Sequence, residues 1–289
     1  MNTNIHARAL LVSLTIGTWT ARKYDRRVSE KVNAEYHAPQ DAGRYNKFLL
    51  PGDAVAYKTL VSLAGAIRAA HYGHTLSWSD EGWRLLPTAN YMEYTAWYRE
   101  KQREFQSALA DFVQEYPYLR SQAQVKLNGL YKDEDYPSVQ DIGKRFRLAV
   151  DYSPVPATGD IRVDLASDQI ATIEASINDR VDSATRTAMS DAWQRLYDVV
   201  TKIADRLSSP DAIFRDSLIS NAREICDSLK RLNITNDPDL EQMRQRVERE
   251  LTATDPDILR DTPHVRQQTA DRAVEIMNKM QGLYRAEVA

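Results

Sequence analysis

The sequence predicts a mainly α-helical fold, an elongated helical bundle or coiled coil that carries a small three-stranded antiparallel β-sheet. Three observations lead to this prediction. Glycine is scarce, with 10 in 289 residues. Apolar residues recur at steps of three and four through the uninterrupted stretch 167–207, which is typical of a long helix. Alternation of apolar and polar residues, which is typical of strands, occurs at about 9–18, 145–152 and 160–165.

The sheet is expected to tie the start of the chain to its middle. The segment "SPVPATG" separates the second and third alternating stretches, and its Pro and Gly residues suit a hairpin turn. A lone hairpin is only marginally stable in water. We therefore expect residues 9–18 to pair with this hairpin as a third strand.

Helices are predicted over most of the remaining chain. The expected ranges are 22–36, 53–71, 90–116, 118–130, 138–144, 167–207, 211–232, 238–251, 257–260 and 263–284. The later starts "SSPDAI", "NDPDL", "TDPDI" and "DTPHV" each place an N-cap residue before a proline. The helix over 167–207 would be about 60 Å long, longer than a compact domain is wide. We therefore divide the chain into an N-terminal α+β region, 1–165, and a long-helix region, 166–289, within one continuous elongated fold.

Composition narrows the function classes. Lys and Arg number 38 and Asp and Glu 41, a net charge of −3, which argues against nucleic acid as the main partner. The single cysteine, Cys226, allows no intramolecular disulfide and indicates a reducing compartment. The longest apolar run, 9–19, is too short to span a bilayer. These features predict a cytoplasmic protein without a membrane partner.

Motifs for catalysis are absent from the sequence. It contains no phosphate-binding glycine loop, nucleophile elbow or zinc-protease motif. Cys226 shares an apolar stripe with Leu229, which indicates a packed thiol. His71 and His74 have a metal-ligand spacing, but no further ligand pair accompanies them, and we interpret them as polar residues at a helix end. The sequence therefore predicts no catalytic residue, no metal and no cofactor.

The stretch "HTLSWSDEGWRLLPTANY", residues 74–91, opens a concentration of aromatic residues. Its candidate residues are Trp78, Trp83, Tyr91, Tyr94, Trp97 and Tyr98. We expect Gly73 to end the preceding helix in a left-handed cap. The favoured interpretation is a packing clamp that pins 74–89 across the helix pair 53–71 and 90–116. An interface is the alternative, because buried Trp and Tyr also mark interfaces, and a ligand pocket is favoured least.

Basic residues form a second candidate site. They are Arg22, Lys23, Arg26, Arg27, Lys144, Arg145 and Arg147. Trp19 and Tyr24 are interleaved with them, a combination that can bind phosphates and bases. The simpler interpretation, which we favour, is a solvated helix whose cations are balanced by Asp25 and Glu30.

Two motifs resemble a known family. They are the strand pattern L-x-V-x-L-x-I-x-x-W followed by "ARKYDRRV", and the segment "YGHTLSWSDEGWRLLPTANYMEY". Over about the first half of the chain they resemble the domain-of-unknown-function family numbered 3150, from phages and proteobacteria. The resemblance implies protein partners, because members look to be encoded beside a MoxR-type AAA+ ATPase and a von Willebrand factor A protein. It implies no catalytic residue.

Three functions follow as expectations. The first is a non-enzymatic phage or bacterial interaction or scaffold protein in the cytoplasm of a bacterial host. It would self-associate and act with such an ATPase and von Willebrand factor A protein. The second is a single-stranded nucleic-acid-binding protein that uses the basic and aromatic residues. The third is a helical pore-forming or membrane-acting protein, which is disfavoured because the expected hairpin carries Arg147, Asp151, Arg162 and Asp164.

Overall fold

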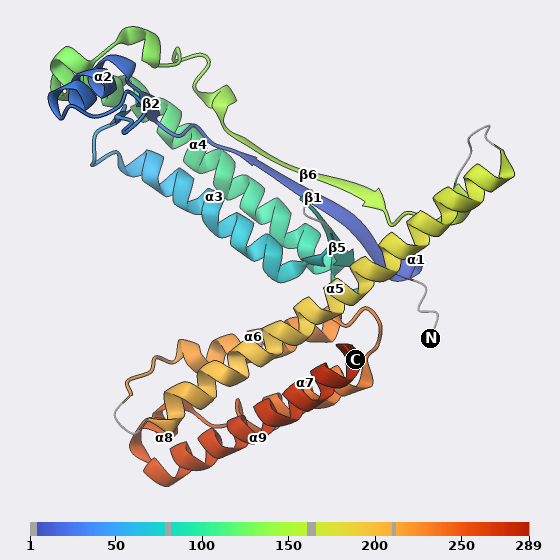
Figure 1. Ribbon diagram of the computed structural model, residues 1–289. Helices are drawn as coiled ribbons and strands as arrows, with labels where there is room; N and C mark the ends of the chain where they lie inside the picture. Colours follow the sequence, from blue (N-terminus) through green and yellow to red (C-terminus); the bar gives the residue numbers. More distant parts are fainter. Residues whose placement is uncertain (1–4, 79–81, 161–165, 210–211, 289) are drawn as a thin grey trace. The chain divides into compact units, whose positions relative to one another are not determined.

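The computed structural model describes residues 5–78, 82–160, 166–209 and 212–288 (Figure 1). This part of the chain is mainly helical with two small antiparallel sheets, which confirms the mainly α-helical character that was predicted. The elongated coiled coil stays a prediction. Its contacts divide the chain into two compact units. Unit 1 comprises Met1–Ser13, His71–Tyr94 and Asp151–Ala289, and unit 2 comprises Leu14–Ala70 and Thr95–Val150.

The larger sheet has four strands where three were expected. In spatial order they are β4 (Leu76–Ser77), β5 (Trp83–Pro87), β1 (Ala9–Gly17) and β6 (Arg147–Pro154). Strand β5 runs antiparallel to β4 and to β1, with Leu11 opposite Leu85. The strands expected at 9–18 and 145–152 are thus present. Of the strand expected at 160–165, Asp160 ends a 3₁₀ turn and 161–165 lie outside the described residues.

Strand β5 lies in the stretch 74–91, where the sequence showed no regular element. Leu85 and Leu86 are both fully buried. Successive residues of a strand point to opposite faces, so both faces of β5 are covered here. A strand that is buried on both faces has no apolar–polar alternation. This is why a search for a period of two did not detect it.

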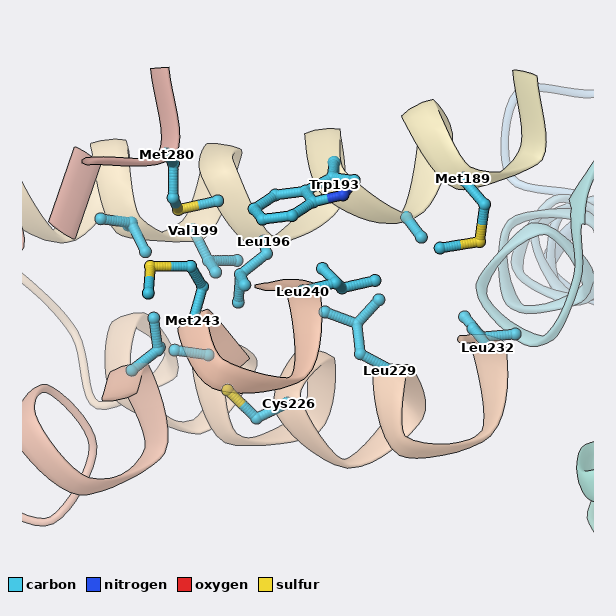
Figure 2. Packing of buried hydrophobic residues seen from close by; sticks show 14 of the residues in the cluster. Met189, Trp193, Leu196, Val199, Cys226, Leu229, Leu232, Leu240, Met243 and Met280 are labelled. Carbon is cyan, nitrogen blue, oxygen red and sulfur yellow. The ribbon is translucent and has the colours of Figure 1, made fainter. Parts of the chain in front are cut away.

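Unit 1 is built around one long helix. Its helices are α1 (Ile5–Arg8), α5 (Ser167–Ser208), α6 (Ser217–Leu232), α7 (Pro238–Glu250), α8 (Pro256–Asp261) and α9 (Pro263–Val288). Helix α5 packs mainly against α9 and α6, and the helix predicted over 167–207 is confirmed. Trp193 and Leu196 meet Met243 and Cys226 in the core (Figure 2). Cys226 is buried, as expected, and burial raises the pKa of its thiol to about 12.

The apolar stripe of α5 is buried over only part of its length. The first buried residue on this helix is Val181. Ile177 is partly buried against the core of unit 1, and Ile173 is 36% exposed. Among the described residues, the stripe is therefore buried only from Val181 onward.

The predicted Asp–Pro helix starts are confirmed for α7 and α8. The Asp237 carboxylate accepts the backbone N–H groups of Asp239 and Leu240, at 2.9 and 3.1 Å. Asp255 accepts the N–H of Asp257 at 2.9 Å. In each case the proline that follows has a fixed φ suited to the first turn and no N–H left to satisfy.

Unit 2 contains β2 (Arg22–Tyr24), α2 (Arg26–Glu35), β3 (Asn46–Phe48) and most of α3 (Val55–His74) and α4 (Tyr91–Leu127). Its core gathers apolar and aromatic side chains from these helices and from the segment before β6. Fully buried members are Leu60, Phe105, Phe112, Tyr116 and Ile142. Aromatic edges meet here, with the Phe112 and Tyr116 rings 5.8 Å apart.

Several predicted helix limits in the first half are wrong. Helix α3 continues through Gly73 to His74, so Gly73 forms no left-handed cap. The helices expected at 90–116 and 118–130 are one helix, α4, with Pro117 inside it. Proline removes one backbone hydrogen bond and costs about 3 kcal/mol in a helix interior. The buried Tyr116 and Leu119 on either side favour continuation despite this cost.

Two further expected helices are also wrong in extent or type. The helix expected over 138–144 is replaced by turns and the 3₁₀ turn Gly143–Arg145. The helix expected over 22–36 is shorter, because its first three residues form strand β2 instead.

Candidate functional site

A short two-stranded ribbon in unit 2 is the centre of the candidate site. Strands β2 and β3 are antiparallel, pairing Arg22 with Phe48, Lys23 with Lys47 and Tyr24 with Asn46. The chain enters the ribbon at Ala21, which has a left-handed φ of 51° and accepts the N–H of Leu49 on its carbonyl at 2.8 Å. The tertiary pairing with residues 46–48 thus keeps Arg22 out of a helix.

Helix α2 begins directly after β2. The Asp25 side chain is the N-cap and accepts the N–H of Val28 at 3.2 Å. Its backbone N–H donates to the Tyr45 carbonyl at 3.0 Å, which continues the ribbon. Strand and helix therefore meet at one aspartate. An aspartate within a charged run is an N-cap signal, and it could have placed the helix start correctly.

A buried cation lies beneath the ribbon. The Lys47 side chain is 2% exposed, and its Nζ lies 2.6 Å from Asp135 Oδ2 and 3.4 Å from Asp25 Oδ2. It also donates a hydrogen bond to the Leu130 carbonyl at 2.8 Å. The pKa of Asp25 is lowered, first by the Val28 N–H and then by the Lys47 ammonium, against the opposing effect of burial. We call these three ionised side chains the Lys47 cluster.

A pocket of about 340 Å³ adjoins the Lys47 cluster. Its lining is Lys23, Tyr24, Asp25, Arg26, Arg27, Glu30, Lys47, Lys132, Glu134 and Asp135. On its rim Arg26 pairs with Glu30 at 2.7 Å. Lys23 and Arg27 have no ion-pair partner within the part of the chain that the structure describes. The floor of the pocket is the Lys47 cluster, whose charges pair with one another. The rim carries Lys23 and Arg27, which are unpaired within the described residues.

The ribbon also presents cations stacked on aromatic rings. The Arg22 guanidinium lies 4.8 Å from the centre of the Phe48 ring, and that of Arg44 lies 5.9 Å from the Tyr24 ring. Phe48 is 61% exposed and Tyr24 45%. Opposite residues of an antiparallel pair share one face, so Arg22 and Phe48 lie on the same side. We call Arg22, Tyr24, Arg44 and Phe48 the ribbon face.

The structure brings together only part of the predicted basic patch. Lys23, Arg26 and Arg27 line the pocket and Arg22 lies on the ribbon face. The remaining three predicted members, Lys144, Arg145 and Arg147, are exposed but do not line this pocket.

Sequence reasoning missed six residues of the site: Arg44, Lys47, Phe48, Lys132, Glu134 and Asp135. They stand in short segments without periodicity, far along the chain from Arg22–Arg27. The one available signal was the combination of Arg, Tyr and Phe in "RYNKF", because these residue types are enriched in binding surfaces.

Charge is distributed unequally between the units. Unit 2 contains 18 Lys and Arg against 13 Asp and Glu, a net charge of +5. Unit 1 contains the remaining 20 and 28, a net charge of −8. The whole-chain value of −3 therefore conceals a basic unit. Such asymmetry is typical of chains in which one part meets an anionic partner.

The six aromatic residues of the predicted clamp are distributed over both units. Trp78 is buried in the core of unit 1, and Trp83 is partly buried against it. Tyr91 meets the Tyr152 ring, with centroids 6.0 Å apart, and Tyr94 is fully buried. Trp97 and Tyr98 pack against the core of unit 2. That Trp78 and Trp83 act as a clamp across two helices stays a prediction.

Tyr94 has a buried histidine as its neighbour. Its hydroxyl lies 3.0 Å from His71 Nδ1. The pKa of His71 falls to about 4, first because of burial and then because of the positive charges of Arg84 and His74. His71 is therefore neutral at pH 7 and serves as a hydrogen-bonding partner inside unit 1.

Polar contacts from α5 anchor the segment that leads into β4. The Asp191 carboxylate accepts the Ser77 N–H at 3.1 Å and the Ser77 hydroxyl at 3.0 Å. Arg195 donates to Asp191 at 2.9 Å and to the carbonyls of Tyr72 and Thr75 at 2.9 and 2.7 Å. These charge-assisted hydrogen bonds give the segment side-chain anchors in addition to its indoles. No sequence pattern indicated them.

Replacing Asp191 with asparagine should lower the free energy of unfolding by about 1–3 kcal/mol, because the half-buried Arg84 and Arg195 then lose a charged acceptor. Urea unfolding followed by circular dichroism measures this. The matched control is Asp198→Asn on the same helix, at an exposed position, with an expected change within about 0.5 kcal/mol. Equal midpoints for the two variants would show that the Asp191 contacts contribute nothing to stability.

Comparison with known proteins gives no match to a family model, a curated protein or a solved structure. Across the described ranges no helix is long and apolar enough to cross a membrane. The same residues contain no group of three or more His, Cys, Asp or Glu side chains that could hold a metal ion.

Proposed function

We propose that this chain is a non-enzymatic interaction or scaffold protein that self-associates through the first turns of α5. One observation carries the proposal. Ile170, Ile173 and Ile177 continue the three–four spacing of the stripe, yet no residue of α5 before Val181 is buried. Isoleucines at the alternating core positions of a heptad are typical of a coiled-coil seam. Ile177 packs partly against the core of unit 1, whereas Ile170 and Ile173 are not part of that core. The first part of the stripe is therefore suited to a partner helix.

The simplest partner is a second copy of the chain. Most soluble oligomers are homo-oligomers, and a helical seam made from two identical stripes is self-complementary in its apolar residues. In this proposal the coiled coil that the sequence predicts forms between two copies of the chain, through the first turns of α5.

Mass photometry and size-exclusion chromatography with light scattering test the proposal. The full chain should have a mass above the 33.0 kDa of a monomer. Ile173→Lys should shift it to the monomer, because an unpaired charge in an apolar seam is costly. Ala175→Lys, on the opposite side of the same turn, is the control and should leave the oligomer intact. A monomeric parent chain at micromolar concentration, or equal masses for both variants, would rule the seam out.

Further partners follow from the family resemblance. We extend the proposal to a MoxR-type AAA+ ATPase and a von Willebrand factor A protein, with the cytoplasm of a bacterial host as the place of action. The support for this extension is the two sequence motifs alone. Co-expression of the three proteins, with purification through a tag on this chain, tests it. Recovery of neither protein would remove the extension and leave self-association as a separate question.

A further inference from the structure

We infer that the ribbon face of unit 2 binds single-stranded nucleic acid, with bases stacked on Phe48 and Tyr24 and phosphates at the surrounding cations. This function is independent of the self-association proposed for α5. It rests on the placement of four features in one unit: exposed rings, arginines over those rings, unpaired rim cations and a positive net charge.

The rings provide the stacking surface. Phe48 is 61% exposed, although a phenylalanine gains most from burial. The ring has an arginine within 4.8 Å on the ribbon. Aromatic rings and arginine guanidinium planes commonly stack on unpaired bases in single-stranded nucleic acid. Each stacked base adds to the affinity, and any of the bases can do so.

The cations provide the phosphate contacts. Tyr24 belongs both to the ribbon face and to the lining of the pocket, so the two surfaces adjoin at this residue. Lys23 and Arg27 lie on that rim without an ion-pair partner within the described residues. Phosphates would bind at the rim rather than the floor, because Asp25 and Asp135 already hold Lys47 there. The +5 charge of the unit favours approach of a polyanion.

Single strands fit this surface better than duplexes. A base pair inside a helix keeps its rings stacked on its neighbours, so only the phosphates of a duplex would be accessible. The ribbon face contains two rings, each with a cation beside it, which suits a short run of splayed nucleotides. An acidic protein would use the cations but would gain little from the exposed rings.

Fluorescence anisotropy with labelled oligo(dT) and oligo(rU) of about 20 nucleotides tests the inference. We expect binding at about 50 mM salt that weakens steeply towards about 200 mM. Phe48→Ala should weaken it about tenfold or more, which is the effect of losing one stacked base. Tyr118→Ala is the matched control, because Tyr118 is also 61% exposed in unit 2 but lies outside the ribbon. It should bind as the parent chain does.

Charge variants separate the two kinds of contact. Lys23→Gln and Arg27→Gln should each reduce the slope of log affinity against log salt by about one. Arg145→Gln, an exposed cation outside the pocket, should leave it unchanged. Preference for oligo(dT) or for oligo(rU) supports the inference and identifies the polymer. No binding at about 50 mM salt, equal affinity for a duplex, or full affinity after Phe48→Ala would each overturn it.

Discussion

Replacing Lys47 with methionine should destabilise unit 2 by about 3–5 kcal/mol, the effect of removing one partner from a buried ionic group. Methionine preserves the length of the side chain, so packing is largely retained. The loss arises because Asp25 and Asp135 then face each other without the ammonium that lies 3.4 and 2.6 Å from them. Both carboxylate side chains are about nine-tenths buried or more.

The pH dependence of stability should change sign in this variant. In the parent chain the pKa of Asp25 lies below its usual value of 3.8, so its ionised form stabilises the fold above about pH 4 and this contribution is lost as the pH falls further. Without Lys47, protonation of a carboxyl relieves the repulsion. The free energy of unfolding of Lys47→Met should therefore rise as the pH falls from about 7 to about 5. That of the parent chain should change little over the same pH range.

Lys23→Met is the matched control. Lys23 lies directly opposite Lys47 in the ribbon but is exposed. The same substitution there should change the free energy of unfolding by no more than about 0.5 kcal/mol. Guanidinium unfolding of both variants at pH 7 and pH 5 gives the comparison. A Lys47→Met variant as stable as Lys23→Met would mean that the Lys47 cluster does not hold the ribbon.

Replacing Trp193 with alanine should destabilise unit 1 by about 3–5 kcal/mol. The indole is 4% exposed and lies in the middle of the core formed by α5, α6, α7 and α9 (Figure 2). Its ring buries about 200 Å². Its Nε1–H also donates to Asp237 Oδ2 at 2.8 Å. Because Asp237 Oδ1 caps α7, one aspartate joins the core tryptophan to a helix start.

A double-mutant cycle separates the hydrogen bond from the packing. Trp193→Phe keeps a ring in the core and loses the donor, with an expected cost of about 1–2 kcal/mol beyond its smaller volume. Asp237→Ala removes the cap as well, at about 1–2 kcal/mol. Since both changes remove the same hydrogen bond, the double variant should lose less than the sum. Strict additivity in thermal unfolding would show that the bond contributes no net stability.

Local sequence information was sufficient for helices α5, α7, α8 and α9 of unit 1, whereas α6 begins at Ser217, later than the expected start at 211. The stripe of α5 and the caps Asp237 and Asp255 are encoded within a few residues of where they act. The same reasoning placed the limits of α3 and α4 wrongly, because a local breaker such as Gly73 or Pro117 was given more weight than the apolar contacts that carry the helix past it.

The candidate site could be predicted only in part. The cations Arg22–Arg27 were recognised by composition, but the ribbon consists of three residues on each strand, too few to show a period. Lysine is almost never fully buried without a partner, and the carbonyl and carboxylate that bind Lys47 stand more than 80 positions later in Leu130 and Asp135. The basic character of unit 2 was concealed because its members are interleaved along the sequence with those of the acidic unit 1.

The hydrogen bonds of Arg195 have a consequence for how the chain folds. Those to Tyr72, Gly73 and Thr75 connect positions separated by 123, 122 and 120 residues. Contacts between such distant positions form only after a long loop has closed, which costs conformational entropy. They raise the contact order of the chain, and a high contact order is associated with slow folding. During synthesis, β4 can form its contacts with α5 only after α5 has emerged from the ribosome. Leu76 of β4, which is fully buried in the same core as α5 in the folded chain, stays without this cover over that interval.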